Sequence, residues 1–421
     1  MSLYDLIAIL LSLAAVFAYF NHRFVGLPNG IGIMLIGLVM SLFLLLLNQL
    51  GWVDSDQAEA MLAQVEFDDT VMKGMLSFLL FAGALHVNLN RLAAMKDTIA
   101  TLATLGVIMS SVIVSVVSYY VFQLFGIDIP YIYCLVFGVL ISPTDPIAVM
   151  GILKKVGAPK AIEVKITGES LFNDGVAVVL FIAVLGVATG QSEATVSGVG
   201  LLFLQEAVGG ALFGLLLGYA GYWMLKSIDS YQIEVLITMA MVTGGYALAM
   251  HWHLSGPIAI VVAGLMIGNQ GRRLAMSAQT RERLDTFWEL VDEVLNAVLF
   301  LLIGMEVLII HFLPSYLYSA LLIIPLVVIA RFISVGLPIS LLRMKNTYPP
   351  HVVKILTWGG LRGGISVALV LSLPPGPHRD PLIAATYAVV LFSIIVQGLT
   401  VGRVAQMANQ TESSRPAAAE K

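Results

Sequence analysis

The chain has 421 residues, of which 59% are hydrophobic and 11% are charged, and its formal net charge is −4. An ordinary soluble domain carries about 25% charged residues, so this composition excludes a soluble globular protein. Apolar runs of roughly 20 residues, the length that crosses the hydrocarbon core, follow one another from Leu3 almost to the last residues. We therefore predict an all-α polytopic membrane protein with no soluble domain, embedded in the lipid bilayer and without a nucleic-acid partner.

Thirteen transmembrane spans are predicted, and the connections between them are short. They cover approximately residues 2–20, 30–49, 68–88, 98–125, 130–153, 160–189, 197–225, 231–250, 253–269, 286–311, 315–342, 351–373 and 381–405. No linker divides them, so residues 1–408 are expected to form one transmembrane domain. Residues 409–421 are then a short tail.

The Lys and Arg residues give the orientation. With thirteen spans, one set of alternate loops and flanks holds all of the 22 basic residues except Lys73, Arg331, Arg362 and Arg379. Basic loops stay in the cytoplasm, so we expect the N-terminus outside the cell and the tail in the cytoplasm. A multi-pass protein of the inner (cytoplasmic) membrane is the expected location.

Five charged residues stand out inside the predicted spans: Asp145, Glu169, Asp174, Arg331 and Arg362. A charge at mid-membrane costs at least ~2.5–3.5 kcal/mol, so each needs a reason. One interpretation is that the acids and bases pair and make the bundle rigid. However, three acids cannot all pair with two bases, and at least one carboxylate remains for a cation or a proton.

The fifth span contains the sequence Ser142-Pro143-Thr144-Asp145-Pro146. A proline removes a backbone donor and disfavours helical backbone at the residue before it, so the helix should break here. Asp145 could then cap a second half-helix that begins at Pro146. It could equally serve an ion site, because broken helices at the midplane are typical of such sites in transporters.

The sixth span presents polar groups at helical spacing. Ser170 and Asp174 share one face as an i, i+4 pair, and Glu169 and Asn173 form the adjoining row. Sodium is a hard cation that prefers oxygen ligands. We predict a sodium site formed by oxygen atoms: the carboxylates of Asp145 and Asp174, the Ser170 hydroxyl and backbone carbonyls near Thr144.

The twelfth span predicts a second break, since Gly359, Gly360, Gly363 and Gly364 surround Arg362. Each glycine weakens a helix by about 1 kcal/mol. Close helix packing is the alternative explanation. Arg362 favours the break, because a guanidinium can satisfy the carbonyl ends of half-helices. The two breaks lie seven spans apart, an odd number, so two six-helix repeats joined by the seventh span would be inverted and would cross their broken helices.

Four segments together resemble the monovalent cation/proton antiporter superfamily, in its sodium/proton exchanger branch of the bacterial or archaeal electroneutral type. They are Thr144-Asp145-Pro146, Glu169-Ser170 followed by Asn173-Asp174, Arg331, and Gly360-Leu361-Arg362-Gly363. The resemblance implies a homodimer in which a core domain (about 98–189 and 315–405) moves like an elevator against dimerisation helices (about 2–88 and 197–311).

The same resemblance assigns roles to single residues. It places Asp145, Ser170 and Asp174 at the ion, and Arg362 at the crossed helices. It implies an ion pair of Glu169 with Arg331. An asparagine before the second aspartate, here Asn173, resembles the electroneutral type of exchanger. Ala82 stands in the third span where many relatives carry an acid.

The residues also support the mechanism on their own. Burial favours a protonated carboxylate and a bound cation favours an ionised one, so protons and sodium compete for Asp174. We expect exchange of sodium, or lithium, for protons, one for one because Asn173 cannot titrate. A potassium/proton antiporter, a cation channel and a solute symporter are the alternatives. The chain is not expected to be an enzyme and should need no cofactor beyond the transported ions.

A last acidic group enters the tenth span from the cytoplasmic side. Asp285, Glu289, Asp292 and Glu293 are interpreted mainly as a polar face at the membrane interface. The alternative is that they help to draw cations into a funnel.

Overall fold

A computed structural model describes residues 3–52, 70–157, 160–190, 200, 204–308, 313–345, 348–349 and 351–413. Within these residues the regular structure is helical, apart from one isolated antiparallel bridge between Asp145 and Leu361. The expected all-α class is therefore confirmed. The final helix continues to Ser413, into the predicted tail, and residues 414–421 lie outside the described part.

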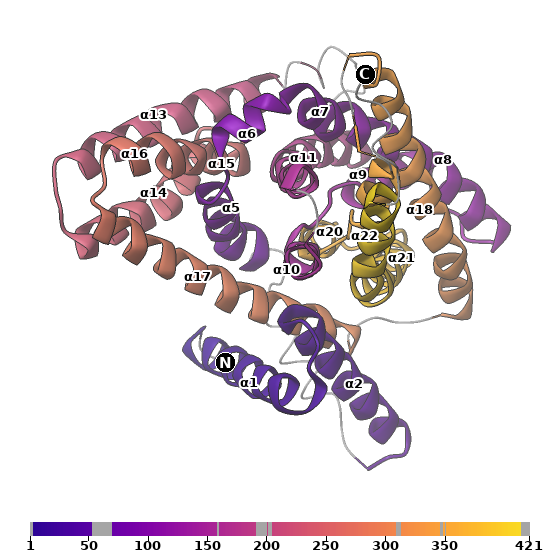
Figure 1. Ribbon diagram of the computed structural model, residues 1–421. Helices are drawn as coiled ribbons and strands as arrows, with labels where there is room; N and C mark the ends of the chain where they lie inside the picture. Colours follow the sequence, from indigo (N-terminus) through magenta and orange to yellow (C-terminus); the bar gives the residue numbers. More distant parts are fainter. Residues whose placement is uncertain are drawn as a thin grey trace.

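The helices fall into a first and a second half of the chain (Figure 1). The first half contains α1 (Leu3–Phe20), α2 (Asn29–Gln49), α5 (Leu76–Leu85), α6 (Leu89–Ala94), α7 (Lys96–Thr101), α8 (Val107–Leu124), α9 (Tyr131–Leu140), α10 (Ile147–Lys155) and α11 (Lys160–Ala188). The second half contains α13 (Gly209–Lys226), α14 (Tyr231–His251), α15 (Gly256–Met266), α16 (Arg272–Leu274), α17 (Ala278–Met305), α18 (Pro314–Leu342), α19 (Val352–Trp358), α20 (Gly364–Leu371), α21 (Arg379–Phe392) and α22 (Gly398–Ser413).

Eight helical segments of the described residues are long and apolar enough to cross a membrane. The protein is thus a multi-pass membrane protein. Each of the thirteen predicted ranges overlaps helical structure, but several are covered by short or interrupted helices, so the number thirteen stays a prediction. α17 begins at Ala278, earlier than the predicted boundary at 286.

Both predicted breaks are present. α9 ends at Leu140 and α10 begins at Ile147, so the two prolines lie in non-helical backbone. α19 ends at Trp358 and α20 begins at Gly364 across the glycine-rich segment. The two breaks meet, because the Asp145 backbone N–H donates to the Leu361 carbonyl at 2.8 Å.

The helices on either side of the breaks pack closely with one another. α9 packs against α8 and α11, and α18 packs against α8 and α21. A second set joins α13 to α15, α15 to α5, and α17 to α2. In Figure 1, α10, α11 and α20 lie between α5 and α17 on one side and α18, α21 and α22 on the other. The interrupted helices therefore occupy the interior of the bundle.

The crossing of α8 and α9 requires a glycine. A Cβ atom on Gly138 would collide with the backbone carbonyl of Ser111. At the same crossing the Ser142 hydroxyl donates to the Gly138 carbonyl at 2.6 Å and lies 3.0 Å from the Ser111 hydroxyl. This contact fixes the chain just before the first break.

Gly138→Ala should lower the stability of the folded protein by about 1–3 kcal/mol, because the added methyl group meets backbone that cannot move aside easily. The measurement is the melting temperature of purified protein in detergent. Gly244→Ala is the control, since nothing lies within 4 Å of the position its Cβ would take. Equal melting temperatures for the two variants would contradict this packing.

Candidate ion-binding site

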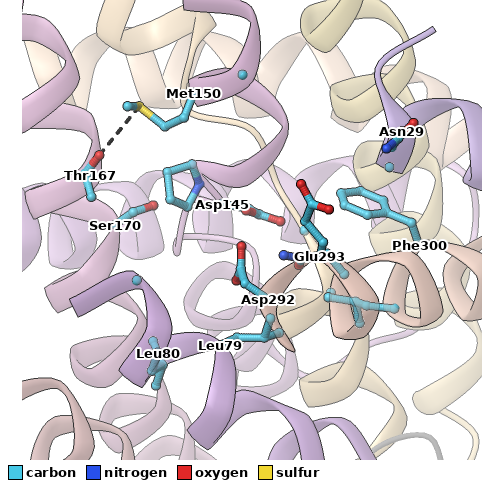
Figure 2. A pocket seen from close by; sticks show the side chains of 18 of the residues that line it. Asn29, Leu79, Leu80, Asp145, Met150, Thr167, Ser170, Asp292, Glu293 and Phe300 are labelled. Carbon is cyan, nitrogen blue, oxygen red and sulfur yellow. Dashed lines mark hydrogen bonds between the residues drawn. The ribbon is translucent and has the colours of Figure 1, made fainter. Parts of the chain in front are cut away.

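A cavity of about 1120 Å³ reaches the first break and the sixth predicted span. Residues of α1, α2, α5 and α17 line one part of it, and residues of α10, α11 and α20 line the other. Asp145, Thr144, Ser170 and Asp174, the four predicted ion ligands, all line this cavity. Figure 2 shows Asp145 and Ser170 facing this space. The structure thus brings together residues from two separate predicted spans.

The segment around Thr144 is held by side chains of α11. The Ser170 hydroxyl donates to the Thr144 carbonyl and also lies 3.2 Å from the Thr144 hydroxyl. Asn173 donates from Nδ2 to the same hydroxyl at 2.9 Å, and the Thr144 N–H approaches Asn173 Oδ1 at 3.5 Å. The amide side chain of Asn173 therefore fastens the break to α11 from a fully buried position.

The two acids differ in exposure. Asp174 is 7% exposed and lies one turn after Ser170, while Asp145 is half-buried in the break. The carboxylates lie near enough to interact electrostatically. Two like charges at this spacing are unfavourable in a poorly solvated site unless a cation or a proton neutralises part of them.

A glycine is required at position 363, where the backbone comes close to the Asp145 side chain. A Cβ atom at this position would collide with the Oδ2 atom of Asp145. The backbone that begins α20 thus packs directly against the Asp145 carboxylate. A backbone without a side chain is needed there because the two breaks cross at this point.

Glu169 and Arg331 are joined away from the cavity. Arg331 Nη1 lies 2.6 Å from Glu169 Oε1, and the side chains are 5% and 1% exposed. Arg331 also donates from Nη2 to the Leu356 carbonyl at 3.4 Å, which links α11, α18 and α19. The ion pair implied by the resemblance is present in the structure.

Arg362 serves the backbone of the other break. Its Nη1 atom donates to the carbonyls of Ser142 and Pro143 at 2.9 and 3.0 Å. Its own backbone N–H donates to the Ser393 hydroxyl at 2.9 Å. The side chain is 2% exposed, and its positive charge lies at the carbonyl end of α9, where a helix dipole favours it.

Sequence reasoning missed one part of the cavity wall. Asp292, Glu293 and Asn296 of α17 line the cavity, whereas the acids were interpreted mainly as an interfacial face. The spacing of Asp292 and Asn296, i and i+4 in an otherwise apolar stretch, is the signal that could have revealed them. Ala82 is 1% exposed in α5, and its neighbours Leu79, Leu80 and Gly83 line the cavity instead.

Two interrupted helices that cross beside carboxylates, with a cavity leading to them, are the architecture of a membrane transport protein. The chain belongs to the sodium/hydrogen exchanger family, whose transmembrane-region model matches residues 10–407. The resemblance noted from the sequence motifs is thereby confirmed.

Individual relatives extend over nearly the whole chain. A protein named Na(+)/H(+) antiporter NhaP from Pseudomonas aeruginosa is 48% identical over 403 residues, which is 94% of this chain and 95% of the relative. A protein named Na(+)/H(+) antiporter NhaH from Halobacillus aidingensis is 37% identical over 381 residues, or 89% and 90% of the two chains.

A solved structure shares the fold. The sodium proton antiporter MjNhaP1 from Methanocaldococcus jannaschii matches with a TM-score of 0.76, over 96% of this chain and 99% of that one. Sequence identity in this match is 20%, so it supports the fold alone.

Glu169→Gln or Arg331→Gln should each destabilise the protein by ~3–5 kcal/mol, because either change leaves one buried charge without its partner. The double substitution should recover at least about half of the summed loss, since the two effects share one interaction. Melting temperatures of the wild type and the three variants measure this coupling. Losses that simply add would contradict a direct stabilising pair.

Proposed function

We propose that the chain exchanges sodium for protons across the cytoplasmic membrane as a secondary active transporter. The observation that carries the proposal is the placement of Asp145 and Asp174 at one cavity, beside the oxygen atoms of Thr144 and Ser170. Family membership and the names of the relatives support sodium and protons as the transported ions.

The ligand set fits a hard monovalent cation. Carboxylate oxygens of Asp145 and Asp174, the Ser170 hydroxyl and the oxygens of Thr144 are the donors that such an ion prefers. In the structure the Ser170 hydroxyl donates to the Thr144 carbonyl. A bound sodium ion would take the place of that proton donor on the carbonyl, with a small rotation of the hydroxyl.

Coupling follows from the cost of moving a charge through the membrane. Asp174 is almost fully buried, and its ionised form is unfavourable there unless a cation lies beside it. The loaded site can therefore change sides when sodium or a proton neutralises it, and an empty charged site cannot. After the site releases one ion on one side of the membrane, it can return only with the other ion bound. Sodium in one direction is thereby coupled to protons in the other.

Elevator-like movement of a core domain would carry the site across. The contacts that hold the site, Glu169 to Arg331 and Arg362 to the first break, join elements within 98–189 and 315–405. The opposite wall of the cavity comes from α2, α5 and α17, within 2–88 and 197–311. The site would thus move as one unit against dimerisation helices of the second group.

We extend the proposal to the architecture. Thirteen spans with an outer N-terminus and a cytoplasmic tail would place two inverted six-helix repeats around the crossed breaks, and two copies would associate as a homodimer. The pairing of the fifth and twelfth spans at Asp145 and Leu361 supports this arrangement, because inverted repeats bring equivalent helices together at the centre.

Asn173 supports a one-for-one exchange. Its amide is engaged with Thr144 and carries no charge at any pH, so the Asn173-Asp174 pair supplies one carboxylate where two adjacent aspartates would supply two. Exchange of one sodium ion for one proton moves no net charge.

Asp174→Asn should abolish sodium-driven proton movement while the protein still folds, because the substitution removes the charge that both ions need. Sealed vesicles with a pH-sensitive dye measure the exchange. Asp380→Asn, a change of the same kind at an exposed position in the first turn of α21, should leave the rate unchanged. Substantial exchange by the Asp174 variant would overturn the assignment.

The rate of exchange should not respond to an imposed membrane potential, since the exchange of one cation for one proton is electroneutral. A potassium gradient with an ionophore sets the potential in vesicles, and the initial rate of sodium-driven proton movement is compared at zero and about 100 mV. A single uncompensated charge would gain ~2.3 kcal/mol at 100 mV, enough for a clear change of rate. Such a change would refute the one-for-one exchange.

A further inference from the structure

A second, much smaller cavity lies among α18, α19, α21 and the second break. It measures about 10 Å³, and none of the described residues that line it also lines the large cavity at Asp145 and Asp174. Its polar lining residues are Arg331, Thr357, Arg362 and Gln397, and Gly360 and apolar side chains of α18 and α21 complete its wall. Every lining residue falls within 315–405, the range proposed to move with the ion site.

Three of these polar residues each bring one buried atom that has no hydrogen-bond partner in the described structure. The atoms are Arg331 Nε, Arg362 Nη2 and Thr357 Oγ1, and the three residues are 4%, 2% and 5% exposed. The other guanidinium contacts are already made, since Arg331 Nη1 lies at Glu169 and Arg362 Nη1 donates to the carbonyls of the first break. Buried polar groups nearly always have a partner in the protein or an ordered water. Three such atoms around one small cavity therefore point to a bound ligand.

Gly360 leaves room for this ligand. A Cβ atom at position 360 would lie 2.7 Å from Arg331 Nε, closer than such atoms can approach without one of them shifting. The Nε atom of Arg331 thus stands beside the wall that Gly360 forms. A side chain at this position would occupy the space next to the Arg331 N–H.

The chemistry of the three atoms selects the ligand. The Nε–H of Arg331 and the Nη2–H of Arg362 can only donate, so the ligand must accept two hydrogen bonds and cannot be a metal cation. The Thr357 hydroxyl can accept as well as donate. A cavity of ~10–15 Å³ holds one water molecule, and a buried water makes about three hydrogen bonds. Both values match this cavity, whereas a chloride ion would accept the same donors but is larger than a water molecule.

We propose that one water molecule is bound between Arg331, Arg362 and Thr357. Its oxygen accepts from Arg331 Nε–H and Arg362 Nη2–H, and one of its hydrogens is donated to Thr357 Oγ1. The two guanidinium groups lie within electrostatic range of each other, and the negative end of the water dipole faces both of them. The water thereby joins the Glu169–Arg331 ion pair to the arginine that holds the first break. Its presence does not depend on the proposed function, but its effect on transport does.

Thr357 acquires a role through this water. Arg362 is held at Nη1 by the carbonyls of Ser142 and Pro143, and the water holds it at Nη2. The orientation of the guanidinium sets the backbone that leads into Asp145. Thr357 is therefore a positioning residue, which acts on the ion site through the water and Arg362 without contacting the ion.

A high-resolution crystallographic map of the purified protein tests the water directly. The wild type should show one density peak within hydrogen-bond distance of all three atoms. Thr357→Val, which keeps the shape of the side chain but has no hydroxyl, should weaken this peak, and Thr357→Ser should keep it. Direct bonds from the three atoms to protein groups, with no peak between them, would overturn the proposal. So would a peak that Thr357→Val leaves unchanged.

Crystals grown with bromide in place of chloride separate a water from an anion. An anomalous signal between the two arginines would show that a halide occupies the site and would refute the water. We expect no anomalous signal at this position. Both measurements on the wild type remain decisive should a variant fail to fold.

Transport measures the positioning role. Thr357→Val should raise the KM for sodium about fivefold and leave the maximal rate within about twofold, whereas Thr357→Ser should keep the wild-type KM. Thr386→Val is the control, because the Thr386 hydroxyl is equally buried but donates to the Leu382 carbonyl of its own helix at 2.8 Å. Its KM should be unchanged.

An unchanged KM in Thr357→Val, or an equal rise in Thr386→Val, would contradict the positioning role. Melting temperatures report whether each variant is folded. If the wild type shows no sodium-driven proton movement, the proposed function fails, and the crystallographic maps still decide whether the water is present.

Discussion

Backbone without helical hydrogen bonds inside a membrane has to find other partners, and this requirement governs the centre of the protein. Lipid offers no donors or acceptors, so a break in a membrane helix is tolerated only where protein or water satisfies it. Here one break satisfies the other. Asp145 donates to Leu361 through the backbone, and Arg362 donates to the carbonyls that α9 leaves free at Ser142 and Pro143. Removing either break would leave the second without its partners.

The two buried arginines, Arg331 and Arg362, have different partners. Arg362 serves backbone carbonyls, and Arg331 is committed to Glu169. Asp145 and Asp174 lie at the cavity instead, and this position supports the proposal that they bind the transported ions.

Much of the centre could be predicted from the sequence because it depends on residues with unusual backbone chemistry. Pro143 and Pro146, and the glycines around Arg362, locate the two breaks, and the odd spacing of spans indicates that they cross. The division of roles between Asn173 and Asp174 is harder to predict. Both face the same region at adjoining positions, and only the structure shows the Asn173 amide hydrogen-bonded to Thr144.

Asp292 and Asn296 could not be placed because their meaning depends on tertiary structure. Charged residues near a helix entrance usually lie at the membrane interface, and a sequence contains no measure of how far a cavity extends along the helix. The true start of α17 at Ala278 puts Asp292 deeper than the predicted boundary suggests. Helix boundaries are among the least certain features of a sequence-based prediction, and here that uncertainty hides a wall of the cavity.

The size of the cavity determines where a sodium ion loses its water. A volume of about 1120 Å³ accommodates on the order of tens of water molecules at ~30 Å³ each. An ion can therefore travel to the crossed helices with its hydration shell, and dehydration is confined to the last few ångströms. Discrimination between cations of different size then takes place at the final ligands.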